Sequence, residues 1–148
     1  MEIVQLIEPD RVSLGLEVAD KSELLSVMAG KASYYSGIAA DTILQALTKR
    51  ESFGSTGVGR GIVIPHTAIK GLKSPLGFFV GLARPIDFES VDGEPVDLVF
   101  LLLTPPSSVN ENVAALAAIS RRLRDAEILK VLRTSKTAQE AFRWLTGV

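Results

Sequence analysis

One apolar run constrains the fold of this chain more than any other feature. Residues 96–103 read Val-Asp-Leu-Val-Phe-Leu-Leu-Leu, and all but one of them are apolar. The run has the length of a strand and falls far short of the about 18 apolar residues that a membrane-spanning helix needs. A strand without a polar face has to be covered on both sides. The run therefore predicts a central strand in a sheet that carries other elements on both faces.

Weaker patterns predict the elements around this strand. Short apolar stretches at residues 62–64 and 76–82 predict two more strands. Capping residues and helical spacing predict helices that begin after Asp20, at Asp41, near Asn110 and after Thr137. Because the connections between the strands are short, some of the strands must be antiparallel. The predicted fold class is α/β, a mixed parallel and antiparallel sheet flanked by helices, in the order of two helices, three strands and two helices.

Length and composition narrow the classes of function. The chain has 148 residues, a net charge of −1 and no cysteine. We expect one domain over residues 1–148 and no binding of nucleic acid, because no basic patch stands out. The first residues lack the basic and apolar regions of a signal peptide, so we expect a cytoplasmic protein that does not insert into a membrane. The absence of cysteine also fits a reducing compartment.

The only histidine, His66, follows an unusual stretch of sequence. Residues 53–61 hold four glycines and predict a loop, which leads into the strand at 62–64 and then into Pro65. This order predicts that the imidazole lies at the exposed end of a strand. A single histidine without any cysteine excludes most metal chemistry. Two interpretations stay open: a structural histidine, or a nucleophile beside glycine N–H groups that can bind an anion.

Three other motifs are poor candidates for chemistry. The glycines of residues 57–61 follow a helix and precede a strand, whereas a dinucleotide-binding loop follows a strand and opens a helix. Residues 54–57 contain Ser55 but lack the strand-to-helix context of a nucleophile elbow. The acidic side chains of residues 89–97 are predicted to be turn and surface charges, because nothing fixes two of them at a catalytic separation.

Arginines supply the candidate anion-binding groups. Arg50 is predicted at the end of the helix that precedes the glycine-rich loop. It is either a surface cation that suits the negative end of the helix dipole or a fork that binds phosphate oxygens bidentately. Arg121, Arg122 and Arg124 are predicted to form a solvated helix face.

Four segments of the chain resemble a known family when they are taken together. They are residues 50–59, 61–66, 84–88 and 92–102. They are similar to the enzyme IIA domains of the fructose–mannitol class in the bacterial phosphoenolpyruvate-dependent phosphotransferase system, and most similar to the nitrogen-regulatory branch. The resemblance implies that His66 accepts a phosphoryl group and that Arg50 lies beside it. It also implies that the donor is a histidine-containing phosphocarrier protein, so that neither metal nor cofactor is required.

The chain departs from this family at one position. The family usually carries a second histidine at the start of the helix after the central strand, and Asn112 stands in its place. An asparagine amide can donate a hydrogen bond to a phosphate oxygen, but it cannot carry charge or accept a proton at neutral pH. Asn112 is therefore the third predicted site residue, after His66 and Arg50.

The leading hypothesis is a regulatory phosphoryl-relay protein that signals through the phosphorylation of His66 to target proteins such as transporters or kinases. One alternative is a sugar-specific enzyme IIA that passes the phosphoryl group to a permease. The other alternative is a docking module that has lost phosphotransfer, which the exchange at Asn112 keeps open.

Overall fold

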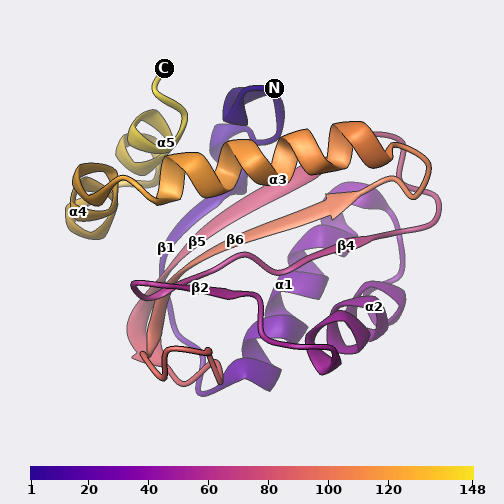
Figure 1. Ribbon diagram of the computed structural model, residues 1–148, viewed down its shortest axis with the longest axis horizontal. Helices are drawn as coiled ribbons and strands as arrows, with labels where there is room; N and C mark the ends of the chain where they lie inside the picture. Colours follow the sequence, from indigo (N-terminus) through magenta and orange to yellow (C-terminus); the bar gives the residue numbers. More distant parts are fainter.

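The computed structural model describes residues 1–148 and is built on one six-stranded sheet (Figure 1). The strands are β1 (Val12–Leu16), β2 (Gly57–Gly59), β3 (Ile62–Val63), β4 (His66–Ala68), β5 (Leu76–Ile86) and β6 (Val96–Thr104). They follow the order β1-β5-β6-β3-β2, and β4 also pairs with β6. Because β6 runs antiparallel to β5 but parallel to β3 and β4, the sheet is mixed, which confirms the predicted fold class.

The central position of β6 is also confirmed. Its side chains alternate between two apolar cores, as the pleat of a strand requires. Phe100 and Leu102 belong to one core, and Val99 and Leu101 belong to the other. All four side chains are at most 1% exposed. The apolar run thus fills both faces of the sheet, and for this reason it carries no polar alternation.

Helices cover the two faces of the sheet. They are α1 (Lys21–Ser36), α2 (Ala40–Ser52), α3 (Val109–Leu123), α4 (Ala126–Thr134) and α5 (Ala138–Thr146), with short 3₁₀ turns at Ile3–Gln5 and Pro9–Arg11. Figure 1 shows α1 and α2 on one face and α3, α4 and α5 on the other. Two predicted helix starts are confirmed by their caps: Asp20 accepts a hydrogen bond from the N–H of Glu23, and Thr137 accepts one from Glu140. No helix is both long enough and apolar enough to cross a membrane.

The predicted order of elements missed β1 and α4. The strand β1 contains Gly15, whose φ of +72° and shift in register break the regular alternation of a strand. The sequence predicts that the helix beginning near Asn110 extends to about Asp125, but α3 ends at Leu123. Asp125 is instead the N-cap of α4, and its carboxylate accepts hydrogen bonds from the N–H groups of Glu127 and Ile128. Asp125 is an N-capping residue type, and this was the sequence signal for the start of α4 rather than for a continuation of α3.

The prediction of a loop over residues 53–61 was wrong in part. Gly57–Gly59 forms β2, which pairs antiparallel with β3. The turn between them needs two left-handed residues, Arg60 at φ 59° and Gly61 at φ 79°. A strand made largely of glycine carries no apolar alternation, so periodicity does not predict it. His66, predicted at the end of the strand at residues 62–64, is instead the first residue of a separate strand, β4. The strand predicted at residues 76–82 is longer and extends to Ile86 as β5.

Candidate functional site

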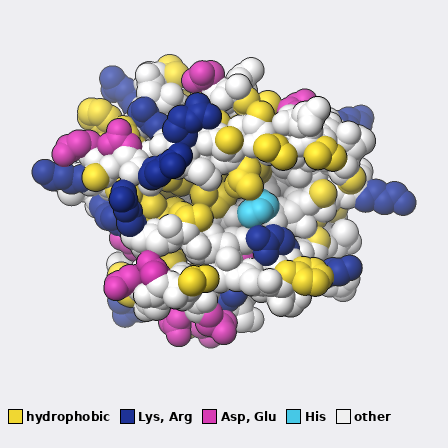
Figure 2. Space-filling model, in the orientation of Figure 1, with side chains coloured by type: hydrophobic (Ala, Val, Ile, Leu, Met, Phe, Trp, Pro, Cys, Tyr) yellow, Lys and Arg dark blue, Asp and Glu magenta, His cyan; other side chains and the backbone are white.

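His66 is held at the end of the sheet by backbone pairing. It is the first residue of β4 and lies opposite Leu102 of β6 in the parallel register. The carbonyl oxygen of Pro65 accepts a hydrogen bond from the N–H of Leu102 at 2.9 Å. Because β6 is buried on both faces, this pairing fixes the backbone that carries the imidazole. Figure 2 shows the histidine at the floor of a shallow hollow, with a Lys or Arg side chain next to it.

The imidazole lines a cavity of about 290 Å³ between the sheet and α3. One side, the sheet wall, consists of His66, Thr67, Ala68, Leu102 and Thr104. The opposite side, the helix wall, consists of Pro106, Val109, Asn112, Val113 and Leu116. The chain passes from one wall to the other through a turn at residues 105–108, which brings the N-terminus of α3 back over the end of β6. Most of the lining is apolar.

The hydrogen bond of the His66 ring selects one tautomer. Nδ1 lies 2.7 Å from the carbonyl oxygen of Ile64. A carbonyl oxygen can only accept, so Nδ1 carries the hydrogen in the neutral ring. The lone pair is then on Nε2. The ring is half-buried, and in its neutral form Nε2 is the nitrogen that can act as a nucleophile.

Asn112 lies on the helix wall of the same cavity. Its Nδ2 donates a hydrogen bond to the carbonyl oxygen of Pro105 at 2.8 Å, which ties the first turn of α3 to the preceding turn. Its Oδ1 is buried and has no hydrogen-bond partner. The first N–H groups of a helix have no partners within the helix, and the dipole makes this end attractive to an anion. The amide therefore has one N–H and one acceptor oxygen left for a bound group.

Arg50 is not among the residues that line the cavity. It lies in the last turn of α2 and is half-buried, and its Nη1 donates a hydrogen bond to the carbonyl oxygen of Gly54 at 3.1 Å. This contact holds the segment that leads from α2 into β2. The structure thus brings His66 and Asn112 to one cavity and attaches Arg50 to the turn before the glycine hairpin.

The other polar motifs form contacts away from the cavity. Glu89, Asp92 and Glu94 are exposed in the turn before β6, as predicted. Asp97 was predicted to be a turn or surface charge as well, but it lies in β6 and pairs with Arg133 at 2.9 Å. Ser55 accepts a hydrogen bond from the N–H of Gly57 within its own turn.

The prediction of a solvated arginine face was wrong for Arg122. Its guanidinium donates to the carbonyl oxygens of Trp144 and Leu145 and satisfies the C-terminal end of α5.

Sequence reasoning missed two contributors to the site. The first is the carbonyl group of Ile64, which sets the tautomer of His66, and a main-chain contact of this kind leaves no mark in the sequence. The second is the apolar helix wall, of which Val109 and Val113 are more than 60% exposed. Their spacing of four residues on α3 was available as a signal, because such residues lie on one face of a helix.

With this geometry described, the comparisons with known proteins define the class of the chain. A family model described as "Phosphoenolpyruvate-dependent sugar phosphotransferase system, EIIA 2" matches residues 5–147. The chain belongs to this family, which confirms the resemblance seen in the sequence. It is a phosphotransferase-system EIIA domain.

Relatives within this class point to its regulatory branch. The nitrogen regulatory protein of Bradyrhizobium diazoefficiens is 43% identical over 142 residues, which cover 96% of this chain and 93% of that protein. The crystal structure of the nitrogen regulatory protein IIA-Ntr from Neisseria meningitidis superposes with a TM-score of 0.93 at 30% identity, covering 97% and 99% of the two chains. The mannitol IIA of Escherichia coli, at 20% identity and a TM-score of 0.75 over 94% and 98% of the chains, shares the fold.

Proposed function

We propose that this chain is a regulatory phosphoryl-relay protein that accepts a phosphoryl group on Nε2 of His66 from a histidine-containing phosphocarrier protein. The observation that carries this proposal is the hydrogen bond from Nδ1 of His66 to the Ile64 carbonyl oxygen, at 2.7 Å. This bond leaves Nε2 as the only ring nitrogen with a free lone pair. The names of the relatives favour the regulatory role over transfer to a sugar permease.

The transfer is an exchange between two imidazoles. Nε2 of His66 attacks the phosphorus atom while the P–N bond to the donor imidazole breaks, and the electron pair of that bond stays on the donor nitrogen. No base has to remove a proton from His66, because Nε2 carries none. The product ring bears a positive charge on Nδ1–H, and the Ile64 carbonyl oxygen stabilises this charge by accepting its hydrogen bond.

Positioning and electrostatics supply the rest of the catalysis, since phosphoryl transfer needs little covalent help from a protein. When a partner protein covers the cavity, its apolar walls exclude water from the transferred group. The N-terminus of α3 and the amide of Asn112 are donors for its oxygens. Arg50 lies outside the cavity in the free protein, and we propose that it reaches the phosphoryl group when the partner binds.

The proposal is tested by locating the phosphoryl group on the ring. The chain is labelled with ¹⁵N-histidine and incubated with phosphoenolpyruvate, Enzyme I and the phosphocarrier. Because there is one histidine, one set of ring signals reports the result. We expect ¹⁵N–³¹P coupling at Nε2 and a retained Nδ1–H. Coupling at Nδ1 would contradict the tautomer argument, and the absence of any phosphorylation would favour a docking module.

A further inference from the structure

A buried carboxylate lies behind the site and has no part in the transfer described above. Glu51 follows Arg50 in the last turn of α2, and its side chain is only 5% exposed. Charged side chains at a helix end are ordinarily solvated, and a buried carboxylate is costly unless it is paired and hydrogen-bonded. Glu51 therefore needs a structural explanation.

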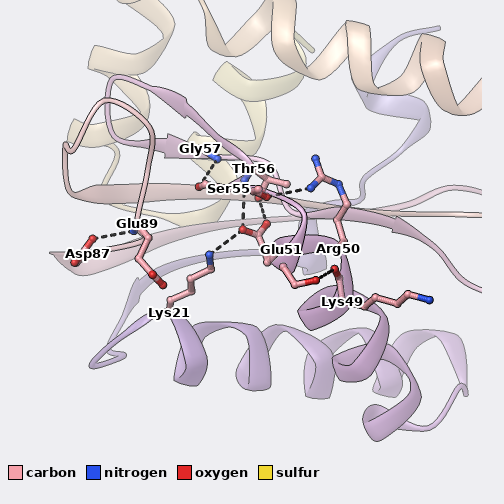
Figure 3. Close-up of polar contacts among 11 residues, drawn as sticks. Lys21, Lys49, Arg50, Glu51, Ser55, Thr56, Gly57, Asp87 and Glu89 are labelled. Atoms are coloured by element: carbon pink, nitrogen blue, oxygen red, sulfur yellow. Dashed lines mark hydrogen bonds and ion pairs between the residues drawn. The ribbon is translucent and has the colours of Figure 1, made fainter.

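Three groups satisfy the Glu51 carboxylate (Figure 3). Nζ of Lys21 lies 3.0 Å from Oε1, the N–H of Thr56 donates to the same oxygen at 3.3 Å, and the hydroxyl group of Thr56 donates to Oε2. Thr56 is itself 5% exposed. The carboxylate thus links the end of α2 to the residue that precedes the glycine hairpin.

The position of Lys21 is unusual and is explained by this contact. Lys21 is the first residue of α1, where the helix dipole disfavours a cation. Its ammonium group lies 4.6 Å from the centroid of the Phe88 ring, which is fully buried. Phe88 and the turn around it shield the ion pair from one side. Two helices and the turn before β6 therefore converge on Glu51.

From Glu51, a continuous series of hydrogen bonds reaches the candidate nucleophile. Thr56, held by the carboxylate, accepts a hydrogen bond on its carbonyl oxygen from the N–H of Ile64 at 3.0 Å. The carbonyl oxygen of Ile64 then accepts the bond from Nδ1 of His66 at 2.7 Å. Ile64, whose carbonyl group sets the tautomer of the ring, is thereby held at its own N–H by Thr56.

The main chain of Glu51, apart from its carboxylate, also contacts the turn that holds Arg50. The backbone carbonyl oxygen of Glu51 accepts a hydrogen bond from the N–H of Gly54 at 3.1 Å, and the carbonyl oxygen of Gly54 accepts the bond from Nη1 of Arg50. In Figure 3 the side chains of Arg50 and Glu51 both extend from the end of α2 toward the segment that contains Ser55 and Thr56. One short segment therefore connects Glu51 to both proposed site residues.

We propose that Glu51 is a positioning residue for phosphoryl transfer: its carboxylate holds Thr56, and Thr56 in turn holds the N–H of Ile64, the residue whose carbonyl oxygen orients the His66 ring. The part of this inference that concerns phosphoryl transfer rests on the proposed function. The part that concerns the His66 ring does not, because the tautomer can be measured in the unphosphorylated protein.

The test compares Glu51→Gln and Thr56→Val with two controls. Glu51→Gln keeps the shape of the side chain but removes the ion pair and one acceptor oxygen, and Thr56→Val removes only the hydroxyl donor. Thr56→Ser restores that donor, so it should behave as the wild type. Asp97→Asn removes the charge from a different ion pair, that between Asp97 of β6 and Arg133 of α4, whose side chains are 28% and 34% exposed and form no side-chain contact with the series.

Two readouts separate positioning from a loss of folding. In ¹⁵N-histidine spectra we expect Glu51→Gln to populate the second tautomer of His66, and Asp97→Asn to leave the spectrum unchanged. In phosphotransfer from the phosphocarrier we expect kcat to fall by about 10- to 100-fold in Glu51→Gln, the range for a misplaced reacting group, with KM almost unchanged. Thr56→Val should show a smaller loss of the same kind.

Urea unfolding of each variant gives its folded fraction, which corrects the measured rates. A wild-type spectrum and a wild-type kcat in both Glu51→Gln and Thr56→Val would overturn the proposal, and so would a loss of rate that the unfolded fraction explains. If the wild type accepts no phosphoryl group, the proposed function fails. The tautomer spectra then still decide whether Glu51 positions the ring.

Discussion

The sheet wall and the helix wall of the His66 cavity differ in how their polar groups are held. On the sheet wall, His66 is fixed by strand pairing with Leu102 and by the Ile64 carbonyl oxygen. On the helix wall, Asn112 uses one N–H for Pro105 and leaves a buried oxygen without a partner. The N-cap of α3, Ser108, makes no side-chain cap hydrogen bond.

This difference between the two walls suits two functions, the chemical step on the sheet wall and the contact with a partner protein on the helix wall. A nucleophile benefits from a fixed orientation, because misplacement of the reacting atom slows the chemical step. A wall that meets a partner protein benefits from adaptable groups and from exposed apolar side chains such as Val109 and Val113. We therefore expect substitutions on the sheet wall to affect chemistry most, and substitutions on the helix wall to have moderate or small effects.

The largest effect is expected for His66→Ala. The variant removes the only imidazole of the chain, so no nucleophile is left to form a phosphohistidine. Intact mass after incubation with phosphoenolpyruvate, Enzyme I and the phosphocarrier should show no added phosphoryl group. An acid-labile phosphoryl group on the variant would mean that the acceptor is not His66, and it would contradict the assignment of the chemistry to the sheet wall.

The next effect is expected for Arg50→Ala. We propose that Arg50 donates to the transferred group once the partner binds, so its removal should slow phosphorylation by about 10²-fold, with little loss of fold. Arg50→Lys keeps the charge but not the planar fork, so it should recover only part of the rate. Rapid-quench phosphotransfer gives both rates. A wild-type rate in Arg50→Ala would mean that this side chain only stabilises the turn at Gly54 and has no role in the transfer.

A moderate effect is expected for Asn112→His. If the amide already supplies a donor to the phosphoryl group, the change should alter the rate by less than roughly tenfold, because asparagine then already provides part of the about 1.5–3 kcal/mol that one hydrogen bond to a charged group contributes. Asn112→Ala shows how much the amide contributes. A rescue of a nearly inert wild type by Asn112→His would mean that the helix wall had lost its function.

The smallest effect is expected for Ser108→Ala. Because Ser108 makes no side-chain cap hydrogen bond, its loss should lower the free energy of unfolding by less than about 0.5 kcal/mol. Thr137→Ala is the matched control: its hydroxyl group caps α5 through Glu140, and its loss should cost about 1 kcal/mol. Urea midpoints measure both changes. A larger cost at Ser108 than at Thr137 would show that the helix wall is more firmly held than its contacts suggest.

Local patterns were enough to predict much of the fold. The apolar run of β6, the caps at Asp20 and Thr137 and the mixed sheet were all predicted, because burial on both faces and N-capping depend on residues close together in the chain. The elements that were missed have weak local signals. In β1 the pattern is broken by Gly15, β2 is made largely of glycine, and α4 follows α3 with only Arg124 and Asp125 between them.

The sequence by itself determined that one imidazole follows a proline at a short strand, and that Asn112 stands near the start of the helix after the central strand. Only the tertiary structure decided what these residues face. The parallel pairing of β4 with β6, followed by the return of α3, brings His66 and Asn112 to one cavity, and a backbone carbonyl group chooses the reactive nitrogen. The tertiary structure also decided that the side chain of Glu51 is buried. Each of these facts depends on groups that are distant in the chain or belong to the main chain, and side-chain periodicity carries no information about either.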